Sequence, residues 1–295
     1  MRLARHVVLL VTLIFGIQSA LVGQEWKSVK SSMLCGISGM VLINHTERQT
    51  QYLVVHDSKK PGQARVAIIT DDPVKAPSYD SVAWPDQDPP IDAESISALP
   101  GEENSFVILA SGGKMFHIKL DLASKTIRVI RTFSVPFVPR GSNFEGLSFQ
   151  QLNGNLVSVW AHRGQDSIPA TLYWGIFDPV NYTFSSTGSD TLRAPWPVSG
   201  VRHISDLRLD PLGILYIVAS SDLGLNGPFQ SAFYVGGVFS TEDKNILFKK
   251  NRVMYRLMQF DYHKIEAMEF VPGPNGGIIF GSDDENMGGW IYTTW

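Results

Sequence analysis

A short motif recurs five times along this chain, and the repetition constrains the fold more than any other feature. In each copy a Ser or Glu precedes a small or polar residue, and an apolar run follows. The aligned positions, called the ring residues below, are Ser38, Glu94, Glu145, Ser205 and Glu266. Successive ring residues are 51 to 61 residues apart. A nearly constant spacing of this length indicates a repeated supersecondary unit.

Strand-like segments recur between the motifs in a regular order. Examples are 51–55, 105–110 and 156–160, which are apolar or alternate with period two and are rich in β-branched and aromatic residues. Turn sequences such as Pro-Gly and Asn-Gly separate them, and no convincing amphipathic helix is present. Four short strands in each of five repeats predict an all-β fold, a five-bladed β-propeller.

The last repeat supplies only three strands, so the propeller needs a fourth from elsewhere. The segment 26–29 can supply it, which would close the ring and remove an open sheet edge. Residues 24–295 are therefore expected to form one domain. A two-sheet sandwich is the alternative for so many short strands.

Residues 1–23 have the layout of a secretory signal peptide. Arg2 and Arg5 precede an apolar run that is short for a membrane span, and small residues follow it. The expected location is secreted or periplasmic, with no membrane segment after removal of the signal. Removal takes away two arginines and changes the formal net charge from −3 to −5, which argues against a nucleic-acid partner.

The ring residues would line the central channel of a propeller, because each lies on the first strand of its blade. Three carboxylates facing one narrow channel need protons or a cation to coexist in a low dielectric. Carboxylate and hydroxyl oxygens suit a hard cation, so the expected ligand of this ring is Ca²⁺. The alternative is that these side chains only bind neighbouring backbone groups and hold the blades together.

The second strand of each blade should return to the channel end where its ring residue lies. The polar residues at these returning ends are Asp57, Lys114, Arg163, Asp222, Asp283 and Asp284. A cation flanked by Lys and Arg would suit a phosphorylated or carboxylated ligand. The alternative is that they are ordinary polar loop residues.

The order Ser, Glu, Glu, Ser, Glu in consecutive blades resembles the calcium-activated nucleotidases, the apyrase family of five-bladed propellers. Segments 38–40, 93–95, 145–147, 205–207 and 265–270 carry this resemblance. It implies a central calcium beneath a nucleotide site, with Asp57 and Arg163 near the phosphates and Lys114 after a Gly-rich turn. Phe144-Glu145-Gly146-Leu147 is equally similar to phytase-like secreted propellers.

These features predict a calcium-dependent hydrolase of a small phosphate ester or anhydride. Calcium would polarise the phosphoryl group, Lys114 and Arg163 would neutralise charge in the transition state, and Asp57 or Asp284 would position water. One alternative is a non-catalytic propeller that binds a glycan, peptide or protein around a structural calcium. Another is an esterase or lactonase that uses the same cation.

Overall fold

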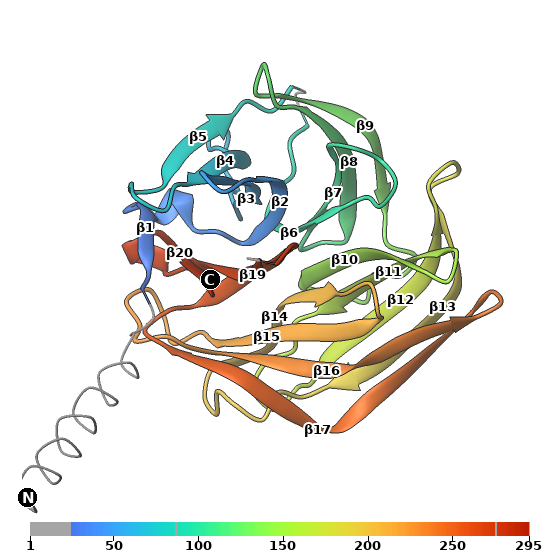
Figure 1. Ribbon diagram of the computed structural model, residues 1–295. Helices are drawn as coiled ribbons and strands as arrows, with labels where there is room; N and C mark the ends of the chain where they lie inside the picture. Colours follow the sequence, from blue (N-terminus) through green and yellow to red (C-terminus); the bar gives the residue numbers. More distant parts are fainter. Residues whose placement is uncertain (1–24, 86–87, 275, 295) are drawn as a thin grey trace, which may run out of the picture.

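The computed structural model describes residues 25–85, 88–274 and 276–294, so the predicted signal peptide at 1–23 lies outside the described residues. The described strands form five four-stranded antiparallel sheets around a common centre (Figure 1). The five-bladed β-propeller predicted from the repeat is therefore confirmed.

The sheets are numbered as blades in chain order, and each is given from its innermost strand outwards. Blade 1 consists of β2 (Gly39–His45), β3 (Thr50–Val55), β4 (Val66–Asp71) and β5 (Ser78–Val82). Blade 2 consists of β6 (Ala93–Ala98), β7 (Ser105–Ala110), β8 (Lys114–Asp121) and β9 (Thr126–Ser134). Blade 3 consists of β10 (Phe144–Leu152), β11 (Asn155–His162), β12 (Ala170–Asp178) and β13 (Thr183–Leu192). Blade 4 consists of β14 (Val201–Leu209), β15 (Ile214–Ser221), β16 (Gln230–Glu242) and β17 (Asn245–Asp261). Blade 5 consists of β18 (Ile265–Val271), β19 (Gly277–Asp283), β20 (Gly289–Thr293) and β1 (Lys27–Lys30).

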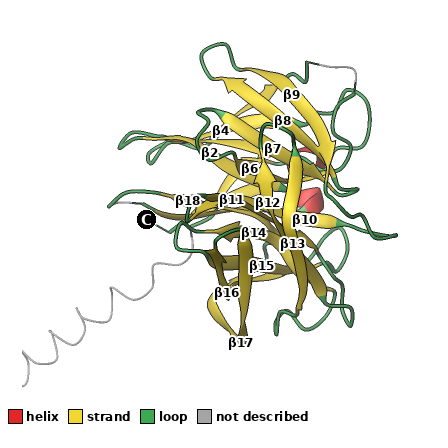
Figure 2. Cartoon of the chain, turned by 90° about the vertical axis from the view of Figure 1, so that its right-hand side faces the viewer, coloured by secondary structure: helices red, strands yellow, loops and turns green. Residues whose placement is uncertain are grey.

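Helical structure in the described residues is limited to short 3-10 turns, as Figure 2 shows. These turns are η1 (Met33–Cys35) and η2 (Glu285–Met287). Among the described residues, no helix is long and apolar enough to cross a membrane.

The strand β1 closes the propeller, as predicted from the sequence. It pairs antiparallel with β20, with Lys27 opposite Ile291, and becomes the outermost strand of blade 5. Lys27 Nζ also lies 2.8 Å from a carboxylate oxygen of Asp71 on β4. The closing strand therefore connects the last blade to the first.

The hydrophobic core is divided among the interfaces between neighbouring blades. Five clusters of buried side chains occur in the described residues, one between each pair of adjacent blades, including blades 5 and 1. Each blade is thus covered on both faces, which explains why its inner strands are apolar on both sides.

The inner strands β2, β6, β10, β14 and β18 lie nearest the centre, and each contacts the next around the ring (Figure 1). Close approach at the centre requires small residues. A Cβ atom on Gly39 of β2 would lie 2.8 Å from the Cα atom of Ser95 on β6. Glycine after a ring residue therefore permits contact between the backbones of neighbouring blades.

Candidate active site at the channel end

Each of the three ring glutamates is the extra residue of a β-bulge. In blade 2, Ala93 and Ser95 face consecutive residues of β7, so Glu94 between them has no partner. The same register shift occurs at Glu145 in blade 3 and at Glu266 in blade 5. A bulge redirects a side chain out of the regular alternation of its strand. The repeated motif thus encodes a repeated irregularity that places three buried carboxylates in one cluster.

One guanidinium joins two of these carboxylates. Arg202 Nη1 donates to Glu266 Oε1 at 2.5 Å and lies 3.5 Å from Glu145 Oε1. The two oxygens are therefore at most about 6 Å apart, the sum of these two contacts. Arg202 Nη2 also donates to Asp222 at 2.6 Å, and this ion pair lowers the pKa of Asp222.

Two further cations complete the neutralisation of this pair. Arg163 Nη1 donates to Glu145 Oε1 at 2.9 Å, and Lys264 Nζ lies 3.2 Å from Glu266 Oε1. Lys264 is buried and also pairs with Glu285. Burial raises the pKa of Glu145, while Arg202 and Arg163 act in the opposite direction.

Glu94 differs from the other two because no cation of the described residues forms an ion pair with it, although the charge of Lys59 interacts with it at longer range. Within the described residues its carboxyl group makes no hydrogen bond or ion pair, and the residue is only 9% exposed. Burial raises the pKa of Glu94 well above its usual value, and the nearby charges of Glu145 and Glu266 raise it further. The site therefore combines a buried carboxyl group that has a raised pKa and no ion pair with two carboxylates that are paired with cations.

The two ring serines lie in different environments. Ser205 Oγ donates to the backbone oxygen of Ile265 at 2.7 Å and so links blade 4 to blade 5. Ser38 Oγ is buried and makes no hydrogen bond, and the same is true of Glu145 Oε2. Ser205 thus links two blades, whereas Ser38 and Glu145 each have one buried oxygen atom without a hydrogen-bond partner.

The polar residues predicted at the returning strand ends lie at different distances from this cluster. Arg163 and Asp222 contact it directly, as described above. Asp57 is partly exposed and pairs with Lys59, and the charge of Glu266 contributes to a raised pKa of Asp57. Asp283 lies 3.9 Å from Lys264, and burial raises its pKa to about 8.

Lys114 and Asp284, also predicted as site residues, have their contacts elsewhere. Lys114 Nζ pairs with Asp88 at 2.7 Å and lies over the ring of Phe116. Asp284 accepts hydrogen bonds from His263 Nδ1 and from the backbone N–H of Lys264. Asp284 therefore fixes the start of β18 and does not contact the ring residues.

Two cations at the site, Arg202 and Lys264, were not predicted from the sequence. Each precedes a ring residue by a few positions, Arg202 by three and Lys264 by two. The available signal was this basic residue just before the motif in blades 4 and 5. It was not interpretable without the bulges that bring these side chains beside the glutamates.

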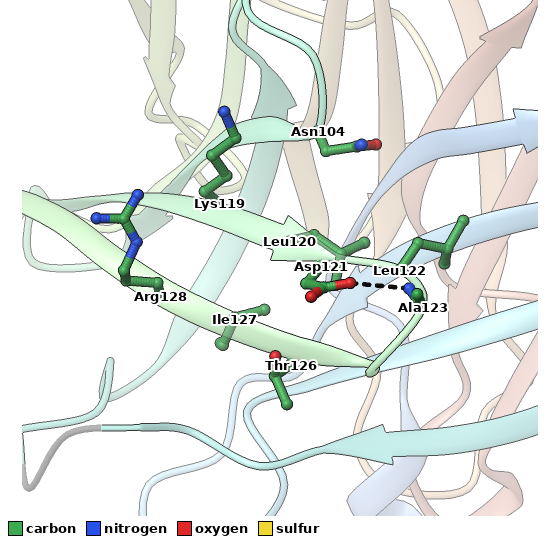
Figure 3. Close-up of a pocket in the computed structure, with 9 residues that line it drawn as sticks. All are labelled: Asn104, Lys119, Leu120, Asp121, Leu122, Ala123, Thr126, Ile127 and Arg128. Carbon is green, nitrogen blue, oxygen red and sulfur yellow. Dashed lines mark hydrogen bonds between the residues drawn. The ribbon is translucent and has the colours of Figure 1, made fainter.

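Two surface hollows lie away from the ring residues, and the acidic side chains considered there already have partners. The one in Figure 3, about 520 Å³, lies at the outer side of blade 2 between β8 and β9. Its one acid, Asp121, accepts a hydrogen bond from the backbone N–H of Ala123 and so closes the turn. A larger hollow of about 860 Å³ lies between blades 5 and 1, where Lys27 and Asp71 are already paired.

The sequence matches no protein-family model and no curated protein. Similar solved structures include the GH43 endo-arabinanase from Bacillus licheniformis, with 11% identity and a TM-score of 0.50, covering 91% of this chain and 97% of that one. The native arabinanase from Bacillus subtilis has 10% identity and a TM-score of 0.49, with coverage of 90% and 95%. The GH32 β-fructofuranosidase from Bombyx mori has 12% identity and a TM-score of 0.47, with coverage of 88% and 61%.

At these identities the likeness concerns the fold. The propeller that the apyrase resemblance implied is confirmed, and structures of glycoside hydrolases have the same architecture. The calcium and the phosphorylated substrate that the resemblance also implied remain predictions. Any chemistry assigned to this chain must therefore rest on its own carboxylate cluster.

Proposed function

We propose that this protein is a glycoside hydrolase that acts with Glu94 and Glu145. The observation that supports the proposal is the pairing of a buried carboxyl group without a cation, Glu94, with a carboxylate held by two arginines, Glu145. Hydrolysis of a glycosidic bond needs two such groups, one protonated and one ionised.

The assigned roles follow from the environment of each carboxyl group. Glu94 would donate its proton to the glycosidic oxygen as the bond to the anomeric carbon breaks. Glu145 would accept a proton from the water that attacks this carbon. Burial raises the pKa of both groups, but Arg202 and Arg163 oppose this effect at Glu145, whereas no ion pair opposes it at Glu94. This difference would favour the proton on Glu94.

The first test is sugar release from arabinan, fructans, galactans and a set of nitrophenyl glycosides. If the roles are correct, Glu94→Gln and Glu145→Gln each reduce kcat by about 100-fold or more, because each removes a proton-transfer group. Glu103→Gln is the matched control, since Glu103 is an exposed glutamate in the β6–β7 turn at the opposite end of the same blade. A folded wild-type protein that cleaves none of these substrates would contradict the proposal.

Calcium-assisted hydrolysis of a phosphate ester is the second candidate. It is favoured by the unpartnered oxygens of Ser38 and Glu145, which are hard donors suited to Ca²⁺. Ser38, Glu94, Glu145 and Glu266 are the ring residues that could hold the ion, because the ion pairs of both Glu145 and Glu266 involve only Oε1, whereas the single hydroxyl of Ser205 donates to Ile265. No group of three or more acidic, His or Cys side chains with metal-binding geometry occurs among the described residues.

The same assay separates the two candidates. Nucleoside diphosphates, nucleoside triphosphates and phytate are added to the substrate set, in calcium and again in chelator. Phosphate release that requires calcium supports the second candidate and excludes the first as the main activity. Sugar release that is unaffected by chelator supports the glycoside hydrolase and excludes the calcium-dependent phosphate hydrolase as the main activity.

A further inference from the structure

A buried ion pair occupies the centre of the propeller beside the ring residues. Asp206 and Arg208 both come from β14, and their side chains are 0% and 4% exposed. Arg208 Nη1 donates to Asp206 Oδ1 at 3.1 Å, and Arg208 Nε lies 3.5 Å from Glu269 Oε2. None of these three residues is part of the carboxylate cluster described above.

This pair contacts the inner strand of every blade. Its partners outside β14 are the backbone oxygens of Met40, Ile96 and Leu147, the hydroxyl of Ser95, the backbone N–H of Met268 and the carboxylate of Glu269. The bonds to Ile96 and Leu147 are both 3.0 Å long, and the bond from Met268 is 2.8 Å. One guanidinium and one carboxylate thus connect strands that are distant in the sequence, since Arg208 and Met40 are 168 residues apart.

The backbone contacts have a constant relation to the ring residues. Met40, Ile96, Leu147 and Met268 each lie two residues after the ring residue of their own blade. The bonded backbone group lies only two residues along the chain from the ring residue, so fixing its position limits where the ring residue can lie. The Asp206–Arg208 pair therefore binds each of these strands at the same position relative to its ring residue, and so at the same level along the central axis of the propeller.

We infer that Asp206 and Arg208 are a positioning pair that sets the height of Glu94, Glu145 and Glu266 relative to one another. The pair acts through the backbone and touches no substrate. Its catalytic consequence rests on the proposed function, but its effect on the five strands does not. An arginine is required because its planar fork can reach several carbonyl oxygens at once, whereas a lysine offers a single ammonium group.

Hydrogen exchange measured by mass spectrometry tests the structural part. In Arg208→Lys, we expect faster amide exchange in β2, β6, β10 and β18 together, although the substitution is on blade 4. Leu207→Ala is the matched control, since Leu207 is the fully buried neighbour on the same strand and packs between blades 3 and 4. Its effect should be confined to β10 and β14. The same confined pattern in Arg208→Lys would overturn the inference.

Kinetics tests the catalytic part. Displaced carboxyl groups should reduce kcat by about tenfold or more in Arg208→Lys, with a smaller change in KM, because proton transfer depends on their geometry. Asp206→Asn, which keeps the shape of the side chain, is the second variant if Arg208→Lys fails to fold. Faster exchange in all five blades with an unchanged kcat would refute the link to catalysis. An inactive wild type would contradict the proposed function alone, because the exchange result would still stand.

Discussion

At the scale of single residues, the balance between carboxylates and cations governs both the chemistry and the stability of the channel end. Glu145 and Glu266 have arginine and lysine partners, whereas Glu94 has none. A buried carboxylate without a partner is unfavourable when it is ionised. Glu94 is therefore expected to contribute to activity at a cost in stability, which is common at functional sites.

Glu94→Gln should stabilise the protein at high pH and have little effect at low pH. The pKa of Glu94 is raised in the folded state, so the unfolded chain loses this proton first as the pH rises. Folding stability therefore falls from about pH 4 up to the folded-state pKa, and the amide removes this loss. We expect a gain of roughly 1–3 kcal/mol at pH 8, measured by urea unfolding. An equal gain in the free energy of unfolding at pH 4 and pH 8 would show that ionisation of the Glu94 carboxyl group is not the cause.

At the scale of secondary-structure elements, the inner strands of neighbouring blades approach each other closely where glycine follows a ring residue. Gly39→Ala would place a methyl group 2.8 Å from the Cα atom of Ser95, so β2 must move away from β6. We expect a destabilisation of about 1–3 kcal/mol and a loss of activity, because the position of Glu94 on β6 would change.

Gly112→Ala is the control for this substitution. Gly112 lies in the turn between β7 and β8, and a Cβ atom there would meet no atom within 4 Å. In thermal unfolding, Gly39→Ala should therefore have a clearly lower melting temperature than Gly112→Ala. Equal melting temperatures would show that the contact between β2 and β6 can relax without cost.

At the scale of the whole molecule, closure by β1 should make the five blades unfold together. Trp26, just before β1, stacks on His263 with ring centroids 3.9 Å apart and lies against Tyr292 of β20. Trp26→Ala should reduce the free energy of unfolding by about 2 kcal/mol, because it removes aromatic contacts that anchor the closing strand. Differential scanning calorimetry should show one transition at a lower temperature.

Tyr255→Ala provides the comparison, since Tyr255 is 67% exposed on the outer strand β17. Its melting temperature should change little. If Trp26→Ala instead produced a separate early transition with the main one unchanged, blade 5 would unfold independently and closure would not couple the ring.

The architecture of this protein could be predicted from the repeat along its chain. The spacing of the ring residues and the strand-like runs between them fixed the number of blades, and the incomplete last repeat identified the segment that closes the ring. These features can be read from the sequence because the alternation of apolar and polar residues and the turn residues each involve only a few neighbouring positions. The positions of Glu94, Glu145 and Glu266 at the channel end followed from the same repeat.

Which charged side chains contact one another could not be predicted in this way, because it depends on how the blades pack. Arg202 contacts carboxylates of blades 3, 4 and 5, and Arg208 binds backbone oxygens in three other blades. Whether a carboxyl group is neutralised, as in Glu266, or left without a partner, as in Glu94, depends on side chains supplied by strands distant in the sequence. The sequence thus located the acids, but burial and the partners supplied by other blades determine their protonation and hence their chemistry.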